Sequence, residues 1–322
     1  MIEIKNSNKT VDTSAYNCLG ILLATAAVQL GVFYQMMARG GWVFDFDSSL
    51  EGTIGNKLSC KQRHDFMESF EKYHEVVAQK HELNRPTFIT KVAEWLSDNT
   101  PVIINTDSFW CPWSFAYHKR NYLHSFMITG VNATTNMLIC RDPYITEKIL
   151  YASLDDIYPG VRHCFTIHKK PNPIEPSLIL SALKEDVEQL LNDGDSMFDN
   201  LHIFGERLDC MNISVECKGF EDSLYAVPLF EKLKSVTCSR RGYSYMIQYI
   251  AYLLNDSHVS DLSERLFKIS TIWEEIRGRL IRHYLRGKYE GLHLLSREIH
   301  QIAEDELSIA VSLSMVLNKK YF

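Results

Sequence analysis

Three residues at the edges of expected regular elements carry side chains suited to nucleophilic acyl transfer. Cys18 begins the first apolar helical pattern, His124 begins an apolar strand-like segment, and Asp142 follows the next such segment. The positive end of a helix dipole favours a thiolate over a thiol. An adjacent imidazole can pair with that thiolate, and a carboxylate can fix the tautomer of the imidazole. Their order and spacing make acyl transfer through a thioester on Cys18 the leading hypothesis.

Each of these residues also has an ordinary structural interpretation. A cysteine in an apolar helix is more often a core residue, and a histidine at a strand start is often only a buried polar group. Asp142 can cap the turn that follows it, and His118 is a rival base in a more polar loop. The position of Cys18 favours catalysis because Asn17 can cap the helix there, and the Cys18 amide can donate to an oxyanion.

The elements that must position these residues change in character along the chain. A Pro-rich linker at 170–176 divides the chain into two parts. The first part begins with a polar lead-in over residues 1–14. Helical spacing covers 17–37, 64–80 and 88–98, and strands are expected over 42–46, 102–107, 124–131, 137–141 and 161–168. After the linker, helices are expected over 177–192, 196–209, 222–235, 241–255, 259–286 and 288–317, with a short extended piece near 211–215. The predicted fold is an α+β domain over residues 1–170 followed by an all-helical domain over residues 177–322.

Composition excludes several classes of function. A length of 322 residues with 46% hydrophobic and 23% charged residues is ordinary for a globular protein of two domains. The net charge of -6 argues against a nucleic-acid partner. The lack of a long apolar run and of a signal-peptide pattern predicts a cytoplasmic protein without a membrane span. The sequence has no CxxC, HExxH, P-loop or GxGxxG motif, so neither a metal nor a bound cofactor is expected.

Several short segments together resemble a known family. They are Asn17–Leu19, residues 102–109 (VIINTDSF), residues 124–130 (HSFMITG) and residues 141–143 (RDP). These segments resemble the butirosin biosynthesis protein H family. The later segment 239–246 (SRRGYSYM) resembles the helical domain of unknown function that often follows it. The resemblance covers nearly the whole chain.

The resemblance implies a papain-like (cysteine peptidase-like) fold for the first domain. The named member of the family is an acyltransferase, which moves an aminoacyl group from a carrier-protein phosphopantetheine thioester to an amine of an aminoglycoside. Carried onto this chain, Cys18 is the nucleophile, His124 the general base and acid, and Asp142 the orienting group. Asp12 stands at the papain-type oxyanion glutamine position, six residues before the nucleophile. An ionised Asp12 would repel an oxyanion, so it is expected to be protonated or directed elsewhere.

Further residues are candidates for contact with substrate or phosphopantetheine. An aromatic loop at 109–117 and the helical domain are candidates for a lid that excludes water. An arginine pair at the start of an expected helix offers forked donors for a phosphate, although a solvated basic pair explains it equally well. The candidate contact residues are Asp107, Trp110, Tyr117, Arg240 and Arg241.

The expected function is cysteine-dependent acyl transfer in secondary-metabolite (antibiotic-type) biosynthesis, which forms an amide. The expected partners are an acidic acyl or peptidyl carrier protein, whose phosphopantetheine is the acyl donor, and a small-molecule amine acceptor. Three alternatives remain open: hydrolysis of a peptide or thioester, intramolecular amide or lactam closure, and ligand binding without catalysis. The long helices after residue 259 are expected to pack either within the chain or in a homodimer.

Overall fold

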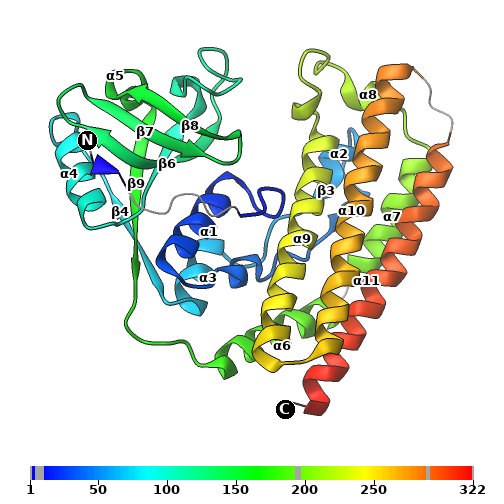
Figure 1. The fold of residues 1–322 in the computed structure, drawn as a ribbon. Helices are drawn as coiled ribbons and strands as arrows, with labels where there is room; N and C mark the ends of the chain where they lie inside the picture. The colour runs from blue at the N-terminus through cyan, green and yellow to red at the C-terminus, as the bar shows by residue number, and fades with distance from the viewer. Residues whose placement is uncertain (1, 4–10, 193–196, 288–290, 321–322) are drawn as a thin grey trace. The chain divides into compact units, whose positions relative to one another are not determined.

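The structure is a computed structural model that describes residues 2–3, 11–192, 197–287 and 291–320 (Figure 1). The expected helix starts at 196 and 288, and most of the polar lead-in, lie outside these residues. The chain divides into two compact units. The sheet unit comprises Met1–Met37 and Met67–Ile174, and the helical unit comprises Ala38–Phe66 and Glu175–Phe322. The predicted α+β and helical character of the two parts is confirmed.

An antiparallel sheet forms the centre of the sheet unit. Its order is β4 (Val76–His81), β9 (Val161–Lys169), β5 (Val102–Asp107), β6 (Leu123–Asn132), β7 (Met137–Asp142) and β8 (Thr146–Ser153), and β1 (Ile2–Glu3) pairs with the end of β6. The β-branched run Val102-Ile103-Ile104 suits a strand that is buried between two neighbours. The register places Thr106 of β5 opposite His124, near the start of β6. His124 therefore lies at one end of a central strand.

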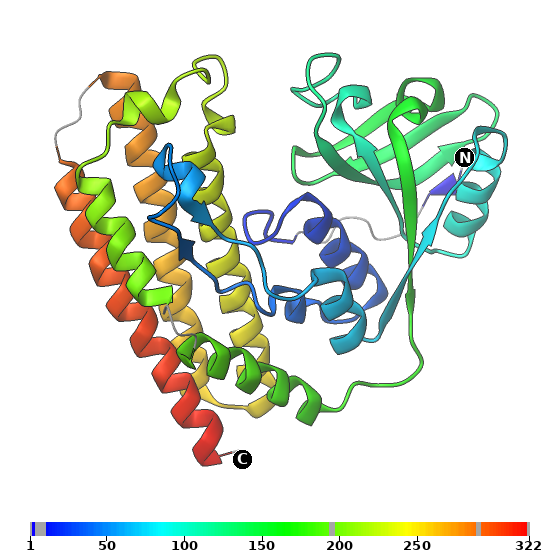
Figure 2. The same ribbon diagram turned by 180° about the vertical axis from the view of Figure 1, so that it is seen from behind.

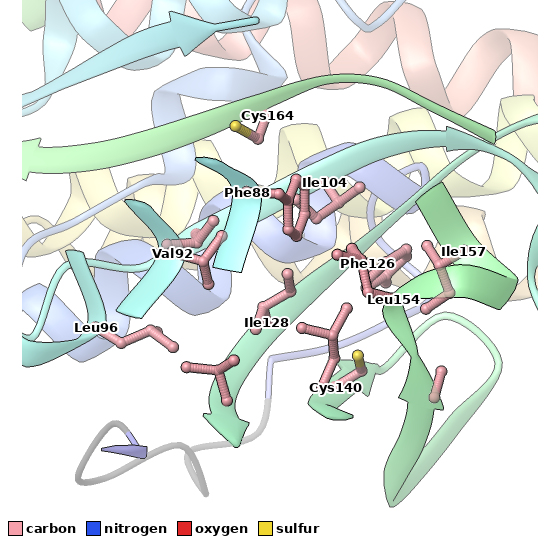
Figure 3. Close-up of a cluster of buried hydrophobic side chains, with 14 of the residues drawn as sticks. Phe88, Val92, Leu96, Ile104, Phe126, Ile128, Cys140, Leu154, Ile157 and Cys164 are labelled. Atoms are coloured by element: carbon pink, nitrogen blue, oxygen red, sulfur yellow. The ribbon is translucent and has the colours of Figure 1, made fainter. Parts of the chain in front are cut away.

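Helices pack on both faces of this sheet. Phe88, Val92 and Leu96 of α4 (Arg85–Ser97) join Phe126 and Ile128 of β6 in a buried apolar cluster (Figure 3). Side chains alternate along a strand, so Met127 points to the other face, where it meets Gln29 of α1 (Cys18–Leu30). Burial of each large apolar side chain contributes about 1.5–3 kcal/mol. The packing against β6 therefore fixes α1, and with it Cys18, against the strand that carries His124.

Shorter elements complete the sheet unit. They are η1 (Gln35–Ala38), α3 (Phe66–Tyr73), η2 (Ser108–Trp110), α5 (Leu154–Ile157) and η3 (Tyr158–Gly160). Residues 76–80 of the helix expected over 64–80 belong to strand β4 instead, because Val76 and its successors pair with β9. Strand β8 was not expected from the sequence, and it pairs with β7 at the edge of the sheet.

Long helices lie side by side in the helical unit (Figures 1 and 2). They are α7 (Met197–Asp209), α9 (Pro228–Leu254), α10 (Ser257–Arg286) and α11 (Leu292–Lys320), with the short α8 (Ile213–Cys217) and η4 (Leu224–Ala226) between α7 and α9 in the chain. A further helix, α6 (Pro176–Asn192), runs at an angle to them. Helix α9 replaces two expected helices, and α8 replaces the expected extended piece. No helix among the described residues has the length and apolar character needed to cross a bilayer.

One segment expected in the first domain belongs to the helical unit instead. Residues 38–66 carry α2 (Ile54–Lys57) and the hairpin of β2 (Asp45–Phe46) and β3 (Leu58–Ser59). The Phe44 ring lies 5.3 Å from the Phe204 ring and 5.8 Å from the Trp273 ring, measured between centroids. Trp42 packs in the same way on Tyr243, at 5.3 Å. Burial of these aromatic side chains against helices places the segment there.

Candidate active site

The N-terminus of α1 presents Cys18 at the edge of the sheet unit. Asn17 is the N-cap, as predicted, and its side chain accepts a hydrogen bond from the Gly20 amide at 2.8 Å. A Cβ added at Gly20 would lie 3.0 Å from Cβ of Tyr16, so a glycine suits this tight first turn. Cys18 is half-buried. Position and exposure both suit a nucleophile.

His124 lies between Cys18 and Asp142. The Cys18 Sγ atom is 3.4 Å from His124 Nδ1, and His124 Nε2 is 2.6 Å from Asp142 Oδ2. Each ring nitrogen therefore faces a different partner. The structure brings together the three residues predicted from the sequence, although they lie on α1, β6 and β7.

Asp142 is completely buried and is held from two sides. Its Oδ2 atom accepts hydrogen bonds from the Trp113 indole N–H at 2.7 Å and from His124. Its Oδ1 atom is buried and receives no hydrogen bond from any described residue. The Trp113 ring packs edge-on against Phe126, with centroids 5.2 Å apart. Trp113 therefore links the carboxylate to the apolar core.

The protonation of His124 depends on its two partners. Burial lowers the pKa of this imidazole, but the hydrogen bond to Asp142 and the hydrogen bond and charge of Cys18 outweigh burial and raise the pKa to about 10. An imidazolium is thus favoured at neutral pH, with one N–H directed at Sγ and the other at the carboxylate. This is the charge state in which His124 can stabilise a thiolate or protonate a leaving group.

The thiol of Cys18 has a second contact, with backbone. It donates to the carbonyl oxygen of Ser125, with Sγ and O 3.0 Å apart. A carbonyl oxygen accepts a hydrogen bond from a thiol but repels a thiolate, so this contact is lost when the thiol ionises. Activation of the nucleophile would require Sγ to exchange the Ser125 carbonyl for the N–H of His124.

Two first-turn amides lie beside the thiol. The Asn17 side chain is occupied by Gly20, and the N–H groups of Cys18 and Leu19 have no hydrogen-bond partner among the described residues. Free amides at a helix N-terminus are donors for a developing oxyanion. Asp12 accepts from the amide and hydroxyl of Ser14, so this carboxylate closes a local turn.

The rival base, His118, is held within the aromatic loop by its neighbours. His118 is exposed, and its ring stacks on Tyr117 with centroids 4.0 Å apart and packs near Trp110 at 5.8 Å. Asp107 accepts from the Phe109 amide at 3.0 Å and so caps the short helix η2. These contacts organise the loop, and none of them directs Asp107, Trp110 or Tyr117 at Cys18.

Arg240 is not available to a phosphate, which corrects the sequence-based interpretation. Its guanidinium is fully buried in the helical unit and pairs with Glu306, with both N–O distances 3.0 Å. Arg241 is also buried: it bonds to Ser270 at 3.2 Å and pairs with Glu274 at 3.1 Å. Helix α9 continues through residues 240 and 241 and buries both arginine side chains. Their ion pairs therefore connect α9 to neighbouring helices.

Trp113 is a residue of the candidate site that the sequence did not predict. It belongs to the expected aromatic loop, but nothing in its sequence context separates it from the neighbouring aromatic residues. Only the fold shows that its indole N–H reaches the Asp142 carboxylate.

Metal binding is the other chemistry that this cluster allows. Among the described residues, Cys18, His124 and Asp142 are the group of three potential ligands whose donor atoms lie within 4.8 Å of one another. A metal ion would require one imidazole nitrogen to converge with the thiolate and carboxylate on a single point. Here the ring lies between the other two groups and uses both nitrogens. This linear order favours proton transfer.

No protein-family model and no curated protein matches the sequence of this chain.

Proposed function

We propose that this protein is a cysteine-dependent acyltransferase that moves an acyl or aminoacyl group from a carrier-protein thioester to an amine. The proposal includes a papain-like arrangement of the sheet unit, with Cys18 on a helix and His124 and Asp142 on neighbouring strands. The observation that carries it is the continuous contact from Cys18 Sγ to His124 Nδ1 and from His124 Nε2 to Asp142 Oδ2, at 3.4 and 2.6 Å. The sequence resemblance to the butirosin biosynthesis protein H family supports the same chemistry.

In the first step, the Cys18 thiolate attacks the carbonyl carbon of the donor thioester. The amides of Cys18 and Leu19 stabilise the oxyanion of the tetrahedral intermediate. The bond from the acyl carbon to the carrier sulfur then breaks, and His124 gives its proton to the departing phosphopantetheine thiolate, which leaves as the thiol. One thioester replaces another, so the step is nearly balanced in energy and catalysis depends on position and charge.

In the second step, an amine attacks the acyl group on Cys18. Neutral His124 takes a proton from the amine nitrogen as the C–N bond forms, and Cys18 leaves as a thiolate. Asp142 stays ionised and holds the ring, while Trp113 holds Asp142. The products are an amide and the free enzyme. Water must be excluded during the lifetime of the acyl-enzyme, because it would otherwise hydrolyse the thioester.

Acyl transfer is tested by product analysis with a small acyl thioester mimic. Wild-type protein is incubated with the mimic in the presence and absence of a primary amine, and amide and free acid are quantified by mass spectrometry. The proposal predicts amide formation that requires Cys18 and increases with amine concentration. Free acid alone, formed at the same rate with and without amine, would identify a hydrolase instead. Products that form equally with Cys18→Ala would contradict both enzymatic roles of the thiol.

A further inference from the structure

Two histidines of the helical unit lie with their rings in contact. His202 lies on α7 and His300 on α11, and their Nδ1 atoms are 2.7 Å apart. The rings are nearly parallel, with centroids 5.0 Å apart and an interplanar angle of 22°. At this distance, the two nitrogens cannot both carry a proton, so at least one directs a lone pair at the other.

A carboxylate lies beside the outer ring nitrogen of His202, Nε2. Glu304 Oε1 lies 3.3 Å from His202 Nε2, and Glu304 follows His300 by one helical turn on α11. A carboxylate at Nε2 favours the proton there and leaves the Nδ1 lone pair directed at His300. An imidazole whose outer N–H is held by a carboxylate is the usual arrangement for a metal-binding histidine.

Gly205 allows this close approach of the two helices. It lies on α7, one turn after His202, and a Cβ added there would lie 3.3 Å from both Cε1 and Nε2 of the His300 ring. A larger residue would push the ring away. The backbone of α7 therefore leaves space for His300 beside His202.

We propose that His202 and His300 bind one divalent transition-metal ion, of the Zn²⁺, Ni²⁺ or Cu²⁺ class, between α7 and α11. Imidazole nitrogen suits these ions. Two nitrogens that each lie about 2.0–2.1 Å from a tetrahedral ion are about 3.3 Å apart, so the rings need to separate by roughly half an ångström. The side chain of His202 is 34% exposed, which gives the ion access and lets water complete its coordination. Glu304 stays on Nε2 as the outer partner. The site is independent of the proposed acyl transfer.

The test is a Zn²⁺ titration by calorimetry on tag-free, EDTA-treated full-length protein. Every variant also carries Cys18→Ala, because the cluster of Cys18, His124 and Asp142 offers donors to the same ion. One saturable Zn²⁺ site is expected in this parent. It should be lost in both His202→Gln and His300→Gln, while Glu304→Gln should bind roughly tenfold more weakly.

A matched control and a second measurement keep the test decisive. His293 is an exposed histidine on the same helix, α11, and His293→Gln should bind Zn²⁺ like the parent protein. Circular dichroism checks that each variant stays helical. Cu²⁺ bound to the parent should show hyperfine coupling to two nitrogens in its electron paramagnetic resonance spectrum. Absence of a saturable site in the parent, or a site unchanged in both His202→Gln and His300→Gln, would overturn the proposal.

Discussion

The two units each bury a charged network, and the networks differ in how completely their hydrogen bonds are satisfied. In the helical unit, both carboxylate oxygens of Glu306 accept hydrogen bonds, from Arg240 and from the Trp42 indole at 2.7 Å. Arg240 also donates to the Val43 carbonyl at 2.6 Å. Arg240 and Glu306 are both fully buried. This network is closed, and it joins residues 38–66 to α9 and α11.

The network of the sheet unit is open at both ends. Cys18 is half-buried, and the Oδ1 atom of Asp142 has no hydrogen-bond donor among the described residues. Between them, one ring nitrogen of His124 faces each partner, 3.4 Å from Cys18 Sγ and 2.6 Å from Asp142 Oδ2. The closed network satisfies both oxygens of Glu306, whereas the open network leaves Asp142 Oδ1 without a donor among the described residues. Burial of charge alone therefore does not mark a functional site.

Removal of one partner from the closed network should have the largest effect on stability. Arg240→Met leaves Glu306 buried without its counter-charge, which costs about 3–5 kcal/mol of the free energy of unfolding. Arg85→Met removes one partner of an ion pair whose side chains are 56% and 70% exposed, and it should cost about 0–1 kcal/mol. Chemical denaturation of both variants measures the difference. Equal costs would contradict a structural role for Arg240.

Loss of the central group of the open network should instead change reactivity. In His124→Gln, Cys18 loses the imidazolium that pairs with its thiolate, and its alkylation by iodoacetamide at pH 7 should slow roughly 30-fold. Peptide mass mapping separates Cys18 from the other cysteines. His118→Gln is the matched control because His118 contacts aromatic rings of the loop. Cys18 in this variant should be alkylated at the wild-type rate. An unchanged rate in His124→Gln would show that the two groups do not interact.

Trp113→Phe tests how far the open network extends. The change keeps an aromatic ring against Phe126 but removes the N–H donor to Asp142. A hydrogen bond to a charged group is worth about 1.5–3 kcal/mol, and we expect Cys18 alkylation to slow roughly tenfold as His124 loses its orientation. Trp110→Phe, in the same loop, should leave the rate unchanged. Equal effects of the two substitutions would assign Trp113 to loop packing only.

Two buried histidines of the sheet unit should give opposite pH slopes in stability. The raised pKa of His124, about 10, means that its stabilising contribution is complete below pH ~6.5 and is lost as pH rises toward 10. Burial lowers the pKa of His74 to about 3, so its contribution is complete above pH ~6.5 and is lost as pH falls toward 3.

Urea unfolding at pH 5, 7 and 9 separates these contributions. His124→Gln should flatten the loss of stability between pH 7 and 9, and His74→Gln should flatten the loss between pH 7 and 5. The assigned charge states are wrong if His124→Gln flattens the loss between pH 7 and 5, or if His74→Gln flattens the loss between pH 7 and 9.

Much of the fold and the candidate triad could be predicted from local patterns. Local signals predicted both residues of the Cys18–His124 contact. They are the Asn17 cap, the apolar run of α1 and the alternation near His124. Other features depend on tertiary packing. The placement of residues 38–66 follows from burial of Phe44 against distant helices. Arg240 resembles a solvated basic residue in the sequence, because its partner Glu306 lies 66 positions later.

The central claim is that Cys18 becomes acylated, and intact mass spectrometry tests it most directly. Wild-type protein, Cys18→Ala and His124→Gln are each treated with a small acyl thioester mimic, and peptide mapping locates any adduct. We predict one acyl group on wild type, located on Cys18, no such adduct on Cys18→Ala and much slower formation on His124→Gln. An adduct that persists in Cys18→Ala, or its absence from wild type with a series of acyl chains, would contradict covalent catalysis by this thiol.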